Sequence, residues 1–552
     1  MKGAAFFLAF ALFCYPAAAQ QSSTSTSSPQ AKTASLMPGL GDLHHPVSTK
    51  NSAAQKFFDQ GLRLIYAFNH DEAARSFQRA AELDPTMAMA YWGIAEAVGP
   101  NYNDPANEPR RKQAYDTIQK ALQLSANAPA SERAYIEALA QRYADDPSAN
   151  LQQLAVNYAN AMREVMKKYP DDLDAATLFA EAEMNLHPWG LWKADGMPEE
   201  GTEEVISVLE SVIRRDPNHM GAVHYYIHTV EASPNPERAL AGANRLAALA
   251  PAAGHLVHMP AHIYIRTGYY DAAVKTNEQA AAADRAYIEA SGVQGIYPMM
   301  YYSHNLHFIA ISAGMTGQFS EAKRAADQLA DNVRPHVKDM PPLEPFMTIP
   351  TAVLVRFHHW HDILQLPAPD PSMKIETSFW HFARGLAFAG TGKLSEAQAE
   401  HTKLVALENA TPADALYSMP INNKTRDILK IADNLLAAKI AMAQGDSASA
   451  ISTLYEAVAV QDALNYGEPP DWFFPVRESL GAALLLNDNA VEAEKVFRED
   501  LQRNPRNPRS LFGLRESLKA QKRDYDVHFV DKQFRAAWKA TDTQLSVQEL
   551  GT

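Results

Sequence analysis

The chain of 552 residues contains a single cysteine, Cys14, which lies close to the N-terminus. The rest of the chain therefore has neither disulfides nor thiolate metal sites. It also lacks a dense block of lysine and arginine, and its formal net charge is −14. A charge of this sign disfavours a general nucleic-acid surface, so we expect no nucleic-acid partner.

The short motifs of several common enzyme classes are missing as well. The sequence contains no P-loop, no GxGxxG dinucleotide turn, no GxSxG elbow and no CxxCH haem attachment. It also contains no HExxH, which argues against a zincin protease. Runs of alternating β-branched residues are isolated fragments, so helices are expected in place of sheets.

The N-terminus has the features of an export signal. A lysine at position 2 is followed by an apolar run over residues 4–15 and by three small residues that form a cleavage site. The run is too short to span a membrane. We expect residues 1–19 to be a signal peptide cleaved near Ala19, which leaves a periplasmic or secreted protein without a transmembrane span in the mature chain.

Residues 20–40 are rich in serine, threonine and glutamine and have no apolar period, which predicts a disordered leader. From residue 41 the pattern is helical, and its regularity varies along the chain. We expect four further regions: N-terminal repeats with an insertion over 41–200, histidine-rich central repeats over 201–335, C-terminal repeats over 336–525, and a C-terminal helix and tail over 526–552.

The early part of the chain matches the 34-residue tetratricopeptide repeat. With Ala54 as position 1, small residues fall at positions 8, 20 and 27, an aromatic residue at 24 and a proline at 32; these are Gly61, Ala73, Ala80, Phe77 and Pro85. The same frame recurs in units that begin at Met220, Gly254 and Ser303. The pattern predicts an all-α, right-handed solenoid of roughly nine to eleven helix pairs, because one pair cannot bury its apolar face alone.

Two histidine pairs repeat with the same period. His224 and His228 stand in HYYIH, and His258 and His262 follow them by 34 positions each in HMPAH. The i,i+4 spacing places each pair on one helix face, and imidazole is the commonest metal-binding side chain. Three more histidines fall in the same central stretch: His255, His304 and His307.

Four stretches carry a further resemblance. They are GDLHHPVSTKNSAAQKFFDQGLRLIYAFNHDEAARSF, HYYIHTVEAS, GHLVHMPAHIYIRTG and YYSHNLHFIA. With them the chain resembles a group of long exported bacterial tetratricopeptide-repeat proteins with histidine-rich repeats, over most of residues 41–520. The resemblance implies the solenoid fold and export, and it implies no activity.

In tetratricopeptide proteins, positions 2, 5, 9, 12 and 13 of the first helix in each repeat face a concave groove. By this resemblance the central histidines share that groove, and the predicted metal ligands are His224, His228, His258, His262, His255, His304 and His307. Glu231 and Glu181 are candidates for a base or for a group that orients an imidazole. The other residues expected in the groove are Trp92, Glu96, Tyr225, Arg266 and Tyr301.

Imidazole and carboxylate ligands without thiolate suit zinc, copper or iron. A site of three or four histidines with one carboxylate keeps an open position, which allows catalysis as well as binding. Two interpretations stay open. The first is a metal-binding solenoid, with the question of enzymatic activity undecided. The second is a cell-envelope scaffold whose groove binds a peptide, protein or small-molecule ligand without catalysis, the histidines serving as hydrogen-bond donors.

Overall fold

The computed structural model describes residues 34–418 and 423–551. The predicted signal peptide, and the predicted leader as far as residue 33, lie outside the described residues. All regular elements in the described ranges are helices, and β-structure there is limited to isolated bridges. The chain is an all-α, tetratricopeptide-type solenoid, as the sequence predicts.

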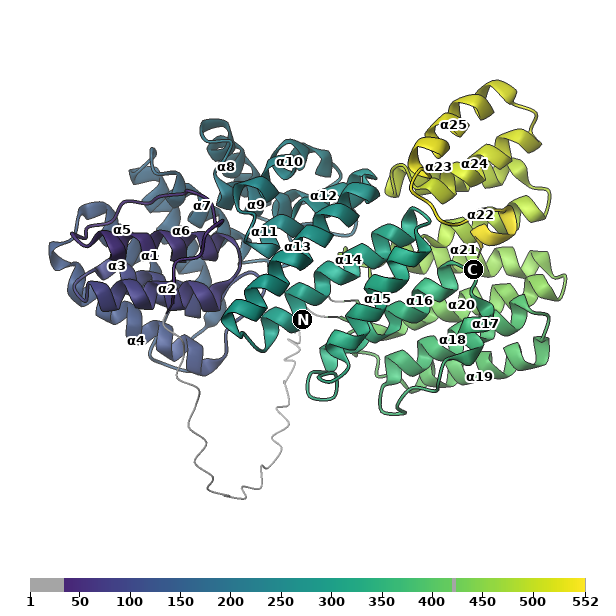
Figure 1. The fold of residues 1–552 in the computed structure, drawn as a ribbon, viewed down its shortest axis with the longest axis horizontal. Helices are drawn as coiled ribbons and strands as arrows, with labels where there is room; N and C mark the ends of the chain where they lie inside the picture. Colours follow the sequence, from purple (N-terminus) through teal and green to yellow (C-terminus); the bar gives the residue numbers. More distant parts are fainter. Residues whose placement is uncertain (1–33, 419–422, 552) are drawn as a thin grey trace, which may run out of the picture. The chain divides into compact units, whose positions relative to one another are not determined.

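Twelve helix pairs follow one another in the described part of the chain (Figure 1). The first six are α1 (Ser52–Tyr66) with α2 (His70–Leu83), α3 (Ala88–Val98) with α4 (Glu108–Leu124), α5 (Ala130–Ala140) with α6 (Leu151–Lys168), α7 (Leu173–Met184) with α8 (Thr202–Arg215), α9 (Met220–Val230) with α10 (Leu240–Leu249), and the interrupted helix α11 (Gly254–His258) and α12 (Pro260–Thr267) with α13 (Tyr270–Ser291).

The other six pairs are α14 (Tyr302–Met315) with α15 (Phe319–Val333), α16 (Ile349–Arg356) with α17 (Trp360–Gln365), α18 (Lys374–Gly390) with α19 (Leu394–Ala410), α20 (Thr425–Ala443) with α21 (Ser447–Asp462), α22 (Val476–Leu486) with α23 (Ala490–Arg503), and α24 (Pro508–Ala520) with α25 (Asp524–Ala537). Short helices lie between or after the pairs: η1 (Ser125–Asn127), η2 (Pro236–Ala239), η3 (Tyr297–Tyr301), η4 (Pro341–Thr348) and α26 (Val547–Leu550).

A phenylalanine wedge joins consecutive pairs at both ends of the solenoid. Phe77 on α2 packs against Gly61 on α1 and Gly93 on α3, and a Cβ built at Gly61 would lie only 2.6 Å from the Phe77 ring. Phe497 on α23 fills the same position between Gly481 and Gly513. Glycine is required at these places because the ring occupies the space of a side chain, which explains the aromatic residue at position 24 of the repeat.

The segment before α1 is extended and held by hydrogen bonds. The amide of Met37 donates to Oε1 of Gln60 on α1 at 2.7 Å, and the amide of Ala252 donates to the carbonyl of Gly39 at 2.9 Å. Residues 34–40 close the stretch expected to be a disordered leader. They are ordered against the first and fifth pairs because the glutamine and the turn after α10 satisfy their backbone groups.

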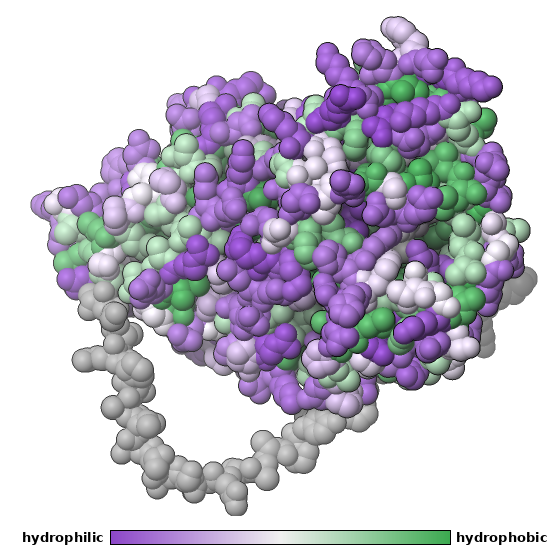
Figure 2. All heavy atoms as spheres, turned by 45° about the vertical axis from the view of Figure 1, so that its right-hand side comes forward, coloured by the Kyte–Doolittle hydropathy of each residue, from purple (hydrophilic) through white to green (hydrophobic). Residues whose placement is uncertain are grey.

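The outer surface is mainly hydrophilic on the face drawn in Figure 2, where smaller hydrophobic areas interrupt the polar cover. This distribution is typical of helices that bury one stripe and expose the opposite face to water. Within the described residues, no helix is both long and apolar enough to cross a membrane.

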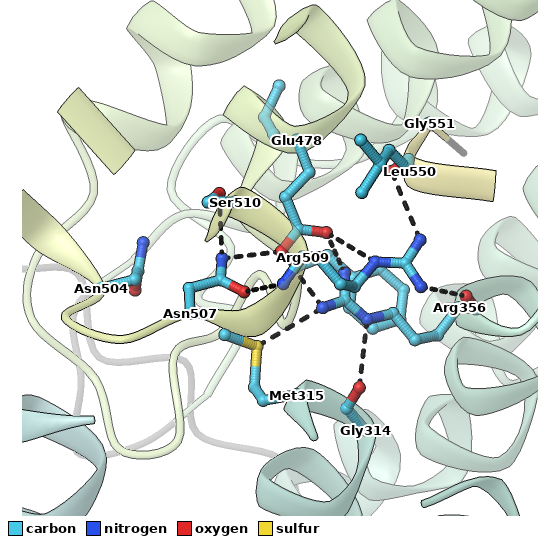
Figure 3. A network of polar contacts seen from close by, with 12 residues as sticks. Gly314, Met315, Arg356, Glu478, Asn504, Asn507, Arg509, Ser510, Leu550 and Gly551 are labelled. Carbon is cyan, nitrogen blue, oxygen red and sulfur yellow. Dashed lines mark hydrogen bonds and ion pairs between the residues drawn. The ribbon is translucent and has the colours of Figure 1, made fainter. Parts of the chain in front are cut away.

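A buried ion cluster joins three first helices near the C-terminus (Figure 3). Oε2 of Glu478 on α22 lies 2.5 Å from Nη1 of Arg356 on α16 and 3.1 Å from Nε of Arg509 on α24. Arg509 also donates to the backbone carbonyls of Glu549 and Leu550, which secures α26. Burial and the neighbouring Arg356 guanidinium lower the pKa of Arg509 to about 9.

Replacing Glu478 by glutamine is expected to lower the free energy of unfolding by about 3–5 kcal/mol, because two buried guanidinium groups would lose their shared counter-charge. Urea unfolding followed by circular dichroism measures this. The control is Glu321→Gln on α15, which breaks an exposed pair with Arg324 and is expected to cost less than about 1 kcal/mol. Equal losses in the two variants would contradict the assigned role.

Candidate metal centre

The seven central histidines lie on the first helices of three consecutive pairs. They come from α9 (His224 and His228), α11 and α12 (His255, His258 and His262) and α14 (His304 and His307). Five of the side chains are buried, while His304 and His307 are partly exposed. The expectation of an open, concave groove at this place is therefore wrong. Glu468, from the loop over residues 463–475 between α21 and α22, contacts His262, and with Pro469 and Asp471 it lines a cavity that also reaches other histidines of this group.

Six of these histidines form two neighbouring sets of three. Ring nitrogens of His224, His228 and His255 all lie within 4.8 Å of one another, and we name these residues the first set. Ring nitrogens of the second set, which consists of His258, His262 and His304, meet the same limit. His307 belongs to neither set, although the sequence placed it among the ligands.

Hydrogen bonds fix which ring nitrogen carries the proton in one histidine of each set. Nδ1 of His224 lies 2.6 Å from the carbonyl oxygen of Tyr66, which can only accept. Nδ1 of His258 lies 2.6 Å from Oδ1 of Asn277, whose Nδ2 donates to the carbonyl of Ala273 at 2.8 Å. Both Nδ1 atoms are therefore donors, and each Nε2 is left with a free lone pair.

Glu231, at the end of α9, connects the two sets. Its Oε1 accepts from Nδ1 of His228 at 2.8 Å, and its Oε2 contacts Nδ1 of His262. Oε2 of Glu468 approaches the same His262 nitrogen at 2.7 Å. Nε2 of His228 is then buried with no hydrogen-bond partner, which leaves it free to bind a ligand.

The two histidines of HMPAH face each other through nitrogens that are not bonded to an acceptor. Pro260 interrupts the helix between them, but Met259 keeps helical dihedrals of φ −51° and ψ −35°, so the i,i+4 alignment survives. Nε2 of His258 and Nε2 of His262 lie 2.6 Å apart. With both Nδ1 atoms acting as donors, a proton between the two Nε2 atoms makes this contact a hydrogen bond.

Burial in the centre favours neutral imidazoles, and His262 is the exception. Burial, with the neighbouring His262 adding to it, lowers the pKa of His228 to about 3 and that of His258 well below its usual value. Burial also acts against charge on His262, but the carboxylates of Glu468 and Glu231 outweigh it and raise its pKa to about 10. Burial and Glu231 raise the pKa of Glu468 to about 7. Neutral imidazole is the form that binds metal ions.

Two acidic residues predicted for the groove lie in a separate polar cluster. Oε1 of Glu96 is 3.4 Å from Nη1 of Arg142, and the side chain of Glu181 is hydrogen-bonded to Asn185. Burial, together with Glu96, raises the pKa of Glu181 to about 7. The structure thus does not bring Glu181 or Glu96 to a histidine. Tyr225 packs beside His224, and burial, together with the charges of Glu181 and Glu96, raises the pKa of Tyr225.

The remaining predicted groove residues differ in what they contact. Trp92 is a core residue, packed against Phe58 and Tyr135. Arg266 donates to the carbonyl of Glu231 at 2.9 Å and therefore supports the segment that carries this carboxylate.

Tyr301 contacts the ring of His255, with centroids 5.3 Å apart, and accepts from Nδ2 of Asn103 at 3.1 Å. It lies beside the first set and lines a cavity there. A histidine-rich stretch elsewhere, HHWH over residues 358–361, is separate: His358 bonds to the carbonyl of Gly551 and stacks on Trp360.

Sequence reasoning missed two polar residues of the centre. Glu468 lies in the loop before α22, where no helical period applies, and nothing in the sequence pairs it with His262. The sequence does contain a signal for Asn277, in its position within the repeat. It occupies position 24 of the unit that begins at Gly254, where the first repeat has Phe77. A polar residue at the position of the buried wedge indicates a buried polar partner on the first helix, which is His258.

The Glu181→Gln variant is expected to change how stability depends on pH. The folded protein binds the Glu181 proton more tightly than the unfolded chain, so stability falls as the pH rises from about 4.5 to about 7. The variant lacks this loss, so above about pH 7 its free energy of unfolding is expected to exceed that of the wild type by on the order of 2 kcal/mol. Unfolding measured across the range tests this, with the exposed Glu203→Gln on α8 as control. A difference that stays constant with pH would contradict it.

No protein-family model and no curated protein sequence matches this chain. Solved structures with a similar arrangement include human IFIT1, in a dimer with m7Gppp-AAAA, at 12% identity, covering 89% of this chain and 91% of that chain with a TM-score of 0.32. Yeast Tom70 is 13% identical and covers 88% of this chain and 100% of its own, with a TM-score of 0.33. A tetratricopeptide repeat protein from Parabacteroides merdae is 12% identical and covers 57% of this chain and 89% of its own, with a TM-score of 0.27. Identities and TM-scores this low carry no argument about what this chain does.

Proposed function

We propose that this protein is an exported helical solenoid that binds transition-metal ions in the buried histidine centre. One observation carries the proposal: the Nδ1 atoms of His224, His228, His258 and His262 are all held by oxygen acceptors. Nε2 of His224, His258 and His262 lies within 3.0 Å of a neighbouring imidazole nitrogen, and Nε2 of His228 is buried without a partner. Ligand histidines in proteins are oriented in this way, by a carboxylate or carbonyl on the second nitrogen.

The donor set supports zinc, copper or iron, since it offers imidazoles and carboxylates and no thiolate. Six imidazoles exceed the need of one tetrahedral ion, and the two sets, with an overlapping group of His228, His262, Glu231 and Glu468, offer donors for two neighbouring ions. Glu231 reaches a histidine of each set and would hold the two ions at a fixed separation. In the metal-free protein a proton on His262 takes the place between His258 and His262.

A metal-dependent reaction on a small molecule fits the centre better than a peptide-binding groove. Five of the seven histidines that a peptide would need are buried, whereas a cavity of about 380 Å³ reaches His228, His262 and His304. Oε1 of Glu468 is buried at this cavity without a partner, which is a suitable place for a base. Export and metal chemistry together describe an enzyme of the periplasm or the cell exterior.

Metal analysis of the mature protein tests the centre. After chelation and reconstitution with zinc, copper or iron, we expect at least one equivalent of one of these ions per chain. The double variant His224→Ala/His258→Ala is expected to lose it while its helical circular dichroism is retained. The control is His359→Ala/His361→Ala, which removes two imidazoles outside the centre and leaves the metal content unchanged. Folded wild-type protein that stays metal-free with all three ions would refute the proposal.

Asn277→Leu tests the orienting role of the hydrogen bond to His258. Loss of a partner that orients a ligand imidazole typically weakens metal affinity by about 10–100-fold, and we expect a loss in this range. Competition with a chromogenic chelator measures the affinity. The control is Asn434→Leu, another buried asparagine on the distant helix α20, for which no change is expected. Equal affinity in Asn277→Leu and wild type would contradict the orienting role of Asn277.

A further inference from the structure

The cavity beside the histidines is lined by two chemically different kinds of side chain. Imidazoles and the carboxyl group of Glu468 are one kind. Aromatic, thioether and aliphatic side chains are the other, chiefly Trp189, Met300, Met340, Phe346 and Ile349. These apolar residues come from three separate stretches, so the cavity exists only in the folded chain. A pocket with an apolar body and a few converging polar groups is the usual form of a small-molecule site.

The charges of the lining restrict the ligand. Among the described residues that line the cavity, none is lysine or arginine, while Glu468 and Asp471 are acidic. In the metal-free protein a carboxylate or phosphate would meet these acidic groups, and His262 is already paired with Glu231 and Glu468, so its entry is costly in a partly desolvated site. A cation, in turn, would be repelled by the metal ions proposed for the two histidine sets. An uncharged ligand avoids both costs.

Unpartnered polar atoms show where the polar part of the ligand would bind. Nε2 of His307 is buried without a hydrogen-bond partner, and the His307 ring is held edge-on against Phe346 with centroids 5.6 Å apart. Oε1 of Glu468 and Nε2 of His228, which also line the cavity, are likewise buried without a hydrogen-bond partner. A buried group left without a partner costs free energy, so a ligand that supplies one is favoured.

The volume sets the size of the ligand. A cavity of about 380 Å³ lies near the lower end of the range of roughly 300–1,000 Å³ that is typical of small-molecule sites. An aromatic ring with a short alkyl chain fits this size, and the aromatic and thioether side chains of Trp189, Phe346, Met300 and Met340 offer favourable contacts for such a ring.

We propose that the cavity binds an uncharged, mainly apolar molecule of this size whose single hydroxyl group or comparable polar end faces Nε2 of His307, next to the histidine sets. The inference rests on the proposed function in one respect, because it makes this molecule the substrate of the metal centre. The binding site itself is defined by the cavity and is tested separately from the metal.

Three probes of matched size test whether the cavity prefers an uncharged ligand: 4-phenyl-1-butanol, 4-phenylbutyrate and 4-phenylbutylamine. Isothermal titration calorimetry is performed on the full mature chain, both metal-loaded and chelator-treated. The alcohol is expected to bind the chelator-treated form at least tenfold more tightly than the acid does, and the metal-loaded form at least tenfold more tightly than the amine does. Equal or tighter binding of the acid to the chelator-treated form, or of the amine to the metal-loaded form, would overturn the inference, as would the absence of alcohol binding to both forms.

Two variants locate the site. Met300→Trp fills the cavity from a partly exposed position on η3 and is expected to weaken alcohol binding at least tenfold, while Met373→Trp, at a partly buried position outside the cavity lining, leaves it unchanged. His307→Leu is expected to weaken binding of the alcohol but not of butylbenzene. Alcohol affinity that is unchanged in Met300→Trp would overturn the assignment. Failure of the metal proposal alone would appear as metal-free protein that still binds the alcohol.

Discussion

The carboxylate of Glu231 is the interaction on which the centre depends. It accepts the Nδ1 hydrogens of His228 and His262, which belong to consecutive helix pairs, and so fixes both rings in a dry interior. An imidazole buried without an acceptor would cost free energy and would be free to turn. With the acceptors in place, the opposite nitrogens are left available and converge. Removing this one carboxylate would leave both sets of histidines without a common support.

The repeat architecture explains why the donors meet at all. First helices of consecutive pairs lie side by side at spacings of roughly 8–10 Å, and a residue at the same position in each helix therefore faces its equivalent in the next. His258 and His262 repeat the places of His224 and His228 for this reason. The second helix of the pair contributes as well, since Asn277 takes the position that Phe77 fills in the first repeat.

Much of the fold and part of the centre are readable in the sequence. The 34-residue frame predicts the helix pairs, the wedges at Phe77 and Phe497, and the first helices that carry the seven histidines, because local periodicity determines which face each residue occupies. The frame fails for Trp92, Glu96 and Glu181, which it assigns to a groove although they lie in the core or in the Arg142 cluster. Periodicity gives the face of a helix, and it does not say what packs against that face.

The sequence by itself determined an all-α repeat protein with histidines aligned on neighbouring first helices. Only the tertiary structure decided that five of these histidines are buried, that Glu468 reaches His262 from a loop more than two hundred positions later, and that an apolar cavity adjoins them. The physical reason is the range of the interactions involved. Helical period and repeat length act between residues close in sequence, whereas a loop outside any helix is placed by the packing of the complete solenoid.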